Sequence, residues 1–340
     1  MKTAIYNPYL DTLGGGERYV MAFAQAMSSA GYGVDVYWKD KNIKKTLEQR
    51  FGMDLDFINI VSDIKRGDGY DVLFWLSDGS IPLLRARHNF LHFQFPFKNV
   101  NGKTLLNKMK LYRIEKVICN SYFTKSFIDN EFGIDSIVIY PPVDVVKIKP
   151  KRKEKIILYV GRFSQLTQAK GQDILIDTFK KFYKSNPEWK LVLAGGIEVG
   201  AVDYVKKLEK LVRKYPIEII KSPSFKEIVD LYGKAKIFWS ASGYGVNEKI
   251  DPKKVEHFGI SLVEAMVASC VPVVYSAGGH KEIVSDGYNG FLWKKTSELL
   301  KITKNIINDS NKLKKYADVA RKSVTVYETE RFEAEVLNLL

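Results

Sequence analysis

Short apolar runs alternate with longer amphipathic segments along the whole chain. Residues 3–6 and 71–75 are apolar runs of strand length, and residues 17–29 carry apolar side chains at helical spacing. Similar runs of strand length cover residues 34–38 and 116–119. Alternating strand and helix signals are typical of parallel sheets covered by helices, so the pattern predicts an α/β fold.

The pattern starts again near the middle of the chain. Residues 147–155 are polar and charged, include a proline and have no apolar face, which predicts a linker. A buried-strand run at 156–160 follows, then a helix at 172–185 and a strand at 190–194. We expect two Rossmann-like doubly wound domains facing each other across a cleft that binds the ligand.

The expected domains are residues 1–148 on the acceptor side and residues 149–327 on the nucleotide-sugar side. Residues 328–340 predict a short helix that could pack on the first domain. The two cysteines, Cys119 and Cys270, lie in apolar stretches without a CxxC pair. This excludes a disulfide framework and argues against a zinc site, so we expect two buried thiols.

Composition and charge narrow the classes of partner. Hydrophobic residues are 46% and charged residues 27%, as in ordinary globular proteins. A net charge of +14 is typical of proteins that bind nucleic acid, an anionic lipid surface or an anionic small molecule. It is equally compatible with a solvated surface that has no binding role. Zinc-finger spacing and RNP sequences are absent from the sequence, so we expect no nucleic acid and favour a peripheral contact with an anionic membrane.

The start of the chain lacks the apolar segment of a signal peptide, and no apolar run is long enough to span a bilayer. We therefore expect a cytoplasmic protein. Its positive net charge further suggests a peripheral position on the cytoplasmic face of the membrane.

Two glutamates eight positions apart, Glu256 and Glu264, flank a Phe-Gly step. The segment from Ile260 onward predicts a helix, whose N-terminus exposes unpaired N–H groups suited to a phosphate. Carboxylates beside an anion site accept hydrogen bonds from hydroxyls. A phosphate site flanked by two such acceptors therefore indicates a nucleotide sugar, which has hydroxyls on both sides of its diphosphate. The alternative interpretation is a capping carboxylate plus a glutamate on a helix surface.

Two further groups of residues fit a diphosphate. Gly161 and Arg162 end a predicted strand, and Lys170 follows eight positions later at the start of a helix. Two cations at that spacing could neutralise a diphosphate leaving group, although each alone could be an ordinary exposed cation. Residues 14–16 are three glycines after the first strand, which permit close approach of the backbone or simply form a flexible turn.

Taken in order along the chain, these motifs resemble glycosyltransferase family 4, a group of retaining enzymes with the GT-B fold. Residues 140–144 (Tyr-Pro-Pro-Val-Asp) and 277–284 (Ala-Gly-Gly-His-Lys-Glu-Ile-Val) extend the resemblance over most of the chain. It implies that Glu256 contacts hydroxyls of the transferred sugar and that Glu264 holds the ribose. Arg162 and Lys170 would neutralise the leaving diphosphate.

The resemblance also implies roles for backbone and for the N-terminal domain. Gly15 and Gly16 would close on the diphosphate, and His92 occupies a place where relatives often carry an active-site histidine. As a lone histidine in an apolar strand, His92 has a structural interpretation of equal weight. N–H groups to the sugar and phosphates would come from four consecutive residues, Phe258, Gly259, Ile260 and Ser261.

The predicted function is transfer of a hexose, mannose or glucose, from a GDP- or UDP-linked donor without a metal or bound cofactor. No Asp-x-Asp motif that could bind a metal ion follows a predicted strand in a suitable place. We therefore expect cationic side chains to neutralise the diphosphate in place of a metal. Hydrolysis has no use for such cations. In our hypothesis the C1–O bond breaks before attack, and the acceptor enters on the same face. The alternatives are a nucleotide-sugar epimerase of the same fold and a non-catalytic nucleotide-sugar-binding protein.

The acceptor is expected to be a glycan or lipid-linked glycan. Residues 8–18 and 256–260 resemble those of mannosyltransferases that extend lipid-linked oligosaccharides. The segment 242–254 is longer than in many family members and directly precedes Glu256. Donor and acceptor choice therefore cannot be carried over from the family at that segment.

Overall fold

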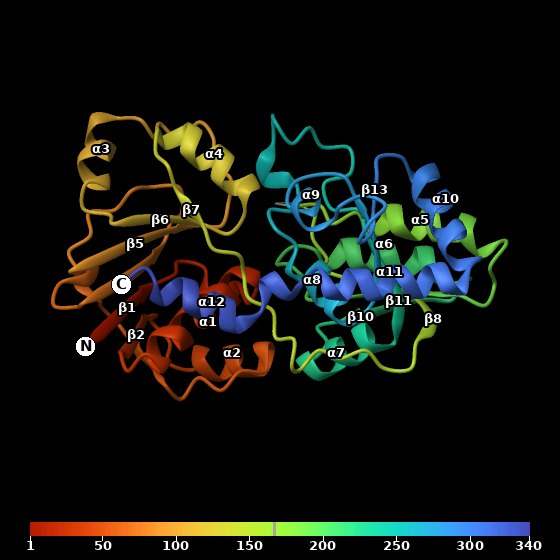
Figure 1. Ribbon diagram of the computed structural model, residues 1–340, viewed down its shortest axis with the longest axis horizontal. Helices are drawn as coiled ribbons and strands as arrows, with labels where there is room; N and C mark the ends of the chain where they lie inside the picture. The colour runs from red at the N-terminus through yellow and green to blue at the C-terminus, as the bar shows by residue number, and fades with distance from the viewer. Residues whose placement is uncertain (166–167) are drawn as a thin grey trace. The chain divides into compact units, whose positions relative to one another are not determined.

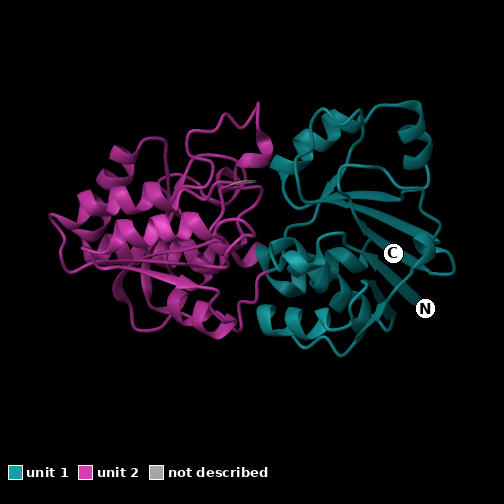
Figure 2. Ribbon diagram, turned by 180° about the vertical axis from the view of Figure 1, so that it is seen from behind, with its two compact units in different colours: residues 1–142, 327–340 teal, residues 143–326 magenta. Residues whose placement is uncertain are grey.

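The computed structural model describes residues 1–165 and 168–340, and the chain divides into two compact units (Figures 1 and 2). Unit 1 comprises Met1–Pro142 and Tyr327–Leu340, and unit 2 comprises Val143–Val326. The division falls a few residues before the expected boundary at 148, and the last residues of the chain belong to unit 1.

Unit 1 is built on a seven-stranded parallel sheet in the order β3-β2-β1-β4-β5-β6-β7. The strands are β1 (Lys2–Tyr6), β2 (Gly33–Tyr37), β3 (Ile58–Val61), β4 (Val72–Leu76), β5 (His88–Phe93), β6 (Lys116–Cys119) and β7 (Ile137–Val138). The chain leaves β1 toward β2 and later returns to β4 on its other side. The carboxyl ends of β1 and β4 therefore form a switch point, where such sheets bind ligands.

Helices cover both faces of this sheet (Figure 1). They are α1 (Gly15–Ser29), α2 (Ile43–Phe51), α3 (Leu105–Leu111), α4 (Tyr122–Phe132) and α12 (Thr329–Leu337), with short 3-10 turns at η1 (Leu10–Thr12) and η2 (Lys65–Gly67). A further 3-10 turn, η4 (Thr325–Tyr327), spans the boundary between the two units in the sequence. Helix α12 packs on α1, where the rings of Phe332 and Tyr19 meet edge to face with centroids 5.1 Å apart. The C-terminal helix thus completes the core of unit 1.

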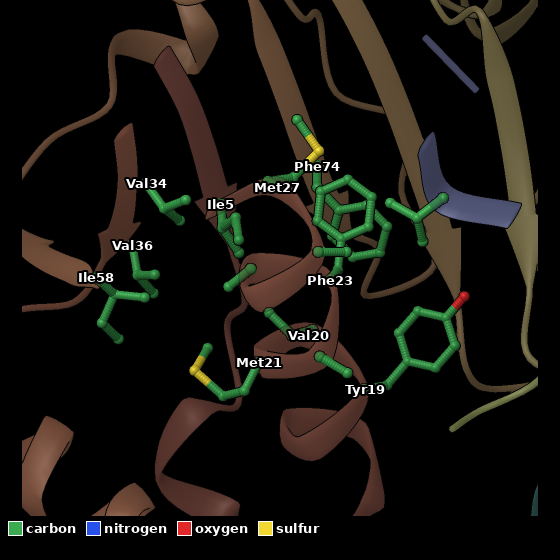
Figure 3. Close-up of a cluster of buried hydrophobic side chains, with 14 of the residues drawn as sticks. Ile5, Tyr19, Val20, Met21, Phe23, Met27, Val34, Val36, Ile58 and Phe74 are labelled. Atoms are coloured by element: carbon green, nitrogen blue, oxygen red, sulfur yellow. The ribbon is translucent and has the colours of Figure 1, made fainter. Parts of the chain in front are cut away.

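Alternation along the strands divides the apolar core of unit 1 between two faces. Ile5 and Phe74 pack against Phe23 of α1 on one face (Figure 3). Ala4 and Leu73 contribute to a separate cluster on the other face. Burying a large apolar side chain stabilises a fold by about 1.5–3 kcal/mol, so these layers hold the sheet and helices together.

Unit 2 repeats the arrangement with six parallel strands in the order β10-β9-β8-β11-β12-β13. The strands are β8 (Glu154–Val160), β9 (Lys190–Gly195), β10 (Ile217–Lys221), β11 (Ala235–Ser240), β12 (Val271–Tyr275) and β13 (Phe291–Trp293). The helices are α5 (Gln172–Tyr183), α6 (Val202–Val212), α7 (Phe225–Lys234), α8 (Ile260–Val267), α9 (His280–Ile283), α10 (Thr296–Ile307) and α11 (Ser310–Lys322), with the 3-10 turn η3 (Pro252–Lys254). Its switch point lies between β8 and β11.

The predicted class of two doubly wound α/β domains is confirmed. The segment predicted as a linker is shorter than expected, because β8 begins at Glu154. The helix expected from Glu17 begins at Gly15, so two of the three glycines are helical. Cys119 and Cys270 are both buried free thiols. Among the described residues, no helix combines the length and apolar character needed to cross a bilayer.

Candidate active site

The predicted donor-binding residues of unit 2 follow the carboxyl ends of its central strands. Arg162 comes directly after β8, and Lys170 lies in the connection from β8 to α5. Glu256 lies between β11 and α8, and helix α8 begins at Ile260. Since parallel strands end at the same edge of a sheet, residues far apart in sequence meet beside the switch point.

Lys170 and Glu256 form a largely buried ion pair. The Nζ atom of Lys170 lies 2.9 Å from a carboxylate oxygen of Glu256, and their side chains retain 10% and 20% of their surface. Lys170 Nζ also donates to Oε1 of Gln168 at 2.5 Å, and the amide of Gln168 donates to the carbonyl of Val255. This network connects the β8–α5 segment to the residue before Glu256.

The electrostatics of the pair keep Glu256 ionised. Burial alone would raise its pKa, but the ammonium of Lys170 and the nearby ring of His280 outweigh that effect and lower it to about 2. Burial in turn lowers the pKa of His280, whose Nδ1 lies 2.9 Å from the carbonyl of Tyr275. Glu256 is therefore an acceptor of hydrogen bonds at neutral pH, and it carries no proton to donate.

The N-terminus of α8 adjoins Glu256. Gly259 caps the helix with φ of 117°, a conformation that side chains disfavour. The first helical hydrogen bonds are donated by Leu262 and Val263 to the carbonyl of Gly259. The backbone N–H groups of Ile260 and Ser261 precede those bonds, as expected for a helix end that suits an anion.

A tight backbone contact positions this helix start. The N–H of Gly279 donates to the carbonyl of Glu256 at 2.8 Å. A Cβ atom on Gly279 would lie 2.4 Å from Cα of Phe258, and one on Gly278 would lie 2.0 Å from the carbonyl oxygen of Glu256. The Gly-Gly step in the 277–284 motif is therefore required for this packing.

Arg162 stands at the end of β8, where two strands approach closely. A Cβ atom on Gly195 would lie 2.0 Å from the carbonyl oxygen of Gly161, so β9 also needs a glycine there. The carbonyl of Arg162 accepts a hydrogen bond from the amide of Gln172 at 2.9 Å. Within residues 1–165 and 168–340, the guanidinium of Arg162 forms no ion pair, which leaves its charge for an anion.

Glu264 lies in α8 and contacts α7. Its side chain is buried, and one carboxylate oxygen accepts a hydrogen bond from the hydroxyl of Tyr232 at 2.9 Å. Glu256 and Glu264 therefore contact different residues, Lys170 for the first and Tyr232 for the second. This separation suits the two different hydroxyl-bearing groups that the sequence predicts for them.

The glycines of unit 1 lie at the N-terminus of α1. The carboxylate of Glu17 accepts hydrogen bonds from the N–H of Gly14 and the hydroxyl of Thr12, both at 2.7 Å. The amide of Gln94 donates to the carbonyl of Gly16 at 2.9 Å. A Cβ atom on Gly16 would lie 1.9 Å from Oε1 of Gln94, so the side chain of Gln94 packs closely against the start of α1. Gly15 is the first residue of α1, and its contact with a diphosphate stays a prediction.

His92 lies inside the core of unit 1. Its ring is fully buried and stacks on Tyr19 with centroids 4.2 Å apart, and Nδ1 is 3.1 Å from the carbonyl of Ile118. Burial lowers its pKa to about 3, so the ring is neutral at physiological pH. This environment agrees with the structural interpretation of His92, and its proximity to a sugar stays a prediction.

The structure adds residues that the motifs did not single out. Glu248, in the long segment 242–254, accepts a hydrogen bond from the N–H of Gly278 at 2.7 Å and forms an ion pair with Lys281. Tyr232 donates a hydrogen bond to Glu264, and the ring of His280 lies near Glu256 and helps to lower its pKa. Only His280 had a sequence signal, because it belongs to the 277–284 motif.

Taken together, unit 2 joins Glu256, Lys170 and the α8 N-terminus in one place, with Arg162 at the end of β8. The arrangement offers fixed positive charge, free backbone N–H groups and one ionised acceptor. Such groups can hold a phosphate and orient a hydroxyl-bearing molecule beside it. Gly15, Gly16 and His92 belong to unit 1.

Comparisons with known proteins agree with this arrangement. Residues 143–323 match the family described as glycosyl transferases group 1, and residues 13–147 match glycosyltransferase family 4. An uncharacterised glycosyltransferase of Methanocaldococcus jannaschii is 31% identical over 186 residues, covering 54% of this chain and 46% of that protein. The chain thus spans less than half the length of that relative.

Two further proteins are similar over longer stretches. The alpha-1,3/1,6-mannosyltransferase ALG2 of Yarrowia lipolytica is 24% identical over 371 residues, covering 84% of this chain and 79% of that protein. The crystal structure of Anabaena HepE in complex with UDP superposes with a TM-score of 0.79 at 20% identity, covering 100% of both chains. That likeness confirms the GT-B fold class, and nothing in these comparisons supports an epimerase. With more than half of its length matched by one family model, the chain belongs to the glycosyl transferases group 1 family.

Proposed function

We propose that this chain is a retaining hexosyltransferase that moves mannose or glucose from a nucleoside-diphosphate sugar to a glycan or lipid-linked glycan. The observation that carries the proposal is the ion pair between Lys170 and Glu256 beside the N-terminus of α8. It brings a cation, helical N–H groups and an ionised acceptor to one place in unit 2.

The leaving group determines which charges the site needs. When the bond between the sugar and the diphosphate breaks, negative charge grows on the phosphate oxygen. Lys170 and Arg162 would stabilise that charge, and preorganised donors of this kind act most strongly in partly buried sites. We therefore propose that the reaction needs neither a metal ion nor a bound cofactor.

The ionisation of Glu256 decides its role. A carboxylate with a pKa of about 2 accepts hydrogen bonds from hydroxyls of the transferred sugar and does not protonate a leaving group. In the proposed reaction the C1–O bond breaks with its electron pair going to the phosphate. The acceptor oxygen then bonds to C1 on the same face and gives its proton to the departing phosphate oxygen, so the configuration is retained.

Donor and acceptor are proposed from the relatives. A similar mannosyltransferase of Neurospora crassa is named for GDP-Man, and HepE was also crystallised with UDP-glucose, so GDP-mannose and UDP-glucose are the first donors to consider. The net charge of +14 supports an acceptor at an anionic membrane surface. We propose a peripheral position on the cytoplasmic face of the membrane, with no nucleic-acid partner.

The experiment measures nucleotide binding and transfer together. Thermal shift with GDP, UDP and ADP identifies the base, since a ligand at a hundred times its Kd stabilises the fold by about 2.7 kcal/mol. The matching donor sugar is then incubated with a lipid-linked oligosaccharide in the presence and absence of a chelator. We expect an α-linked product from an α-linked donor by NMR, with the rate unchanged by the chelator.

Stereochemistry, metal independence and the transfer activity can each be refuted by a separate result. An inverted product would refute the retaining mechanism, and loss of transfer with the chelator would refute metal independence. Formation of an epimer from donor alone would favour the epimerase alternative. Stabilisation by a nucleotide without transfer to any glycan tested would favour a non-catalytic binding protein.

A further inference from the structure

Helix α3 of unit 1 presents an apolar surface to solvent. No residue of this helix is buried. Four large apolar side chains of α3 and its C-terminal end are exposed, namely Leu105 (75%), Leu106 (61%), Met109 (65%) and Tyr112 (93%). Isolated exposed apolar residues are common, but four from neighbouring positions of one short segment are not.

Their spacing gathers them on one side of the helix. Leu105, Met109 and Tyr112 follow the i, i+4, i+7 pattern of a single helical face, and Leu106 lies beside Leu105. On the other side, the partly buried Leu111 and Ile114 pack against the core cluster that includes Phe93. The helix is therefore anchored to unit 1 on one side and has its apolar side open.

Basic residues surround the open side. Between residues 98 and 116 the chain has six lysines or arginines and one acidic residue, Glu115. Lys103, Lys108 and Arg113 are exposed, and Lys110 is half-buried. Long basic side chains can keep their charges in water or at lipid headgroups while their stems cover apolar surface. An apolar strip bordered by cations is the composition of helices that lie in the interface of a membrane.

We infer that α3 inserts its apolar side, Leu105, Leu106, Met109 and Tyr112, into the surface of an anionic lipid bilayer. Charge complementarity selects this occupant, since lysines and arginines at a bilayer surface are attracted to anionic headgroups. The inference rests on the proposed function, because a lipid-linked acceptor brings the chain to a membrane. It goes beyond that proposal by assigning the contact to one helix of unit 1.

The test measures binding to vesicles by flotation. Vesicles of phosphatidylcholine alone are compared with vesicles that also contain phosphatidylglycerol, at low and high salt. Wild-type chain is expected to float with the anionic vesicles at low salt and to dissociate at high salt. The triple variant Leu105→Asn, Leu106→Asn, Met109→Asn is expected to bind at least about tenfold more weakly, because it removes most of the apolar surface available for insertion.

Matched controls separate this surface from general charge and hydrophobicity. Val326 and Tyr288 are exposed apolar residues elsewhere, so Val326→Ser with Tyr288→Ser should bind like wild type. Reversing the charges of Lys108 and Arg113 to glutamate should weaken binding to anionic vesicles. The same reversal at Lys314 and Lys315, which are exposed in α11, should have a much smaller effect.

Several results would overturn the inference. They are the absence of vesicle binding by wild type, equal binding by the triple variant, and self-association of wild type that the triple variant abolishes. Thermal shift with nucleotide in the same samples reports on the proposed function separately. A nucleotide shift without vesicle binding would overturn the inference alone, and vesicle binding without a nucleotide shift would count against the proposed function alone.

Discussion

The ammonium of Lys170 lies 2.9 Å from the carboxylate of Glu256, although 86 residues separate the two in sequence. Both side chains are largely buried, so each charge needs the other to offset the cost of leaving water. The pair ties the segment before α5 to the segment before α8. Any change to one member should therefore affect both the local structure and the chemistry that we propose for it.

Replacing either member of this pair should nearly abolish sugar transfer. Glu256→Gln keeps the size of the side chain and removes its charge, and Lys170→Met removes the cation from the proposed diphosphate site. We expect the transfer rate to fall by about 10²–10³-fold in each variant, the usual cost of losing one preorganised charge-stabilising group. The measurement is the initial rate with the donor identified by thermal shift, with circular dichroism to verify folding.

Lys155→Met is the matched control for that comparison. Lys155 pairs with Glu188 at 3.2 Å in the same unit, but both side chains are about half exposed. Exposed pairs contribute about 0–1 kcal/mol, so this variant should transfer sugar at the wild-type rate. Full activity of Glu256→Gln or Lys170→Met would remove the proposed site from the mechanism.

The stability of the chain should depend on pH through Glu256. Its pKa in the folded protein is about 2, below its ordinary value of 4.5, because the ammonium of Lys170 outweighs the effect of burial. The lowered pKa contributes stability that is complete above about pH 4.5 and is lost as the pH falls toward 2. The contribution amounts to about 3 kcal/mol.

Urea unfolding of wild type and Glu256→Gln between pH 7 and pH 3 measures this contribution. The difference in free energy of unfolding should be constant near neutral pH and should narrow on acidification below about pH 4.5. A difference that stays constant down to pH 3 would show that Glu256 has an ordinary pKa and no strong partner.

Much of the fold was predictable because strand and helix periodicities differ. The apolar run at 71–75 corresponds to β4 (Val72–Leu76), and the run at 156–160 lies within β8. The division between units and the destination of α12 were less predictable, because an amphipathic helix can pack on any exposed apolar face. Phe332 of α12 packs on Tyr19 of unit 1, and this contact cannot be predicted from the local sequence pattern of either segment.

Some residues of the candidate site could be predicted from the sequence and others could not. Glu256, Lys170 and the α8 N-terminus could be proposed from the sequence because the motif, the glycine and the helix signal occur at fixed spacing. Tyr232 gave no such signal, since a tyrosine on an amphipathic helix is usually a core residue. Glu248 lies in the long segment where the resemblance to the family is weakest, and only tertiary structure brings it to Gly278.

Tyr232→Phe should weaken nucleotide binding more than it weakens catalysis. The hydroxyl of Tyr232 donates to Glu264 at 2.9 Å, and both residues are buried. Removing a hydrogen bond to a charged group costs about 1.5–3 kcal/mol and takes away one of the contacts that orient the carboxylate. If Glu264 holds the ribose, nucleotide affinity should fall by about tenfold, equivalent to 1.4 kcal/mol, with little change in kcat.

Tyr70→Phe provides a control of the same chemistry in unit 1. The hydroxyl of Tyr70 donates to the carboxylate of Asp35 at 2.9 Å, and neither residue belongs to the proposed site. Calorimetric titration with nucleotide should give wild-type affinity for this variant. Equal affinity in Tyr232→Phe and Tyr70→Phe would contradict the assignment of Glu264 to the ribose.

Gly279→Ala should destabilise unit 2 and disturb the helix end proposed to bind phosphate. The added Cβ atom would lie 2.4 Å from Cα of Phe258 and 2.7 Å from the carbonyl oxygen of His257, and backbone atoms cannot move aside as a side-chain tip can. Overpacking of this kind costs about 3 kcal/mol. For a unit of this size, the melting temperature should fall on the order of 10 °C.

The same substitution at Gly33 isolates the steric effect. A Cβ atom there would have the carbonyl of Met1 as its nearest neighbour at 3.9 Å, so Gly33→Ala should melt within a few degrees of wild type. Nucleotide should stabilise Gly33→Ala as it stabilises wild type and should stabilise Gly279→Ala less, because the shifted Phe258 displaces the N–H groups of Ile260 and Ser261. An undiminished nucleotide shift in a destabilised Gly279→Ala would mean that the start of α8 does not bind the phosphates.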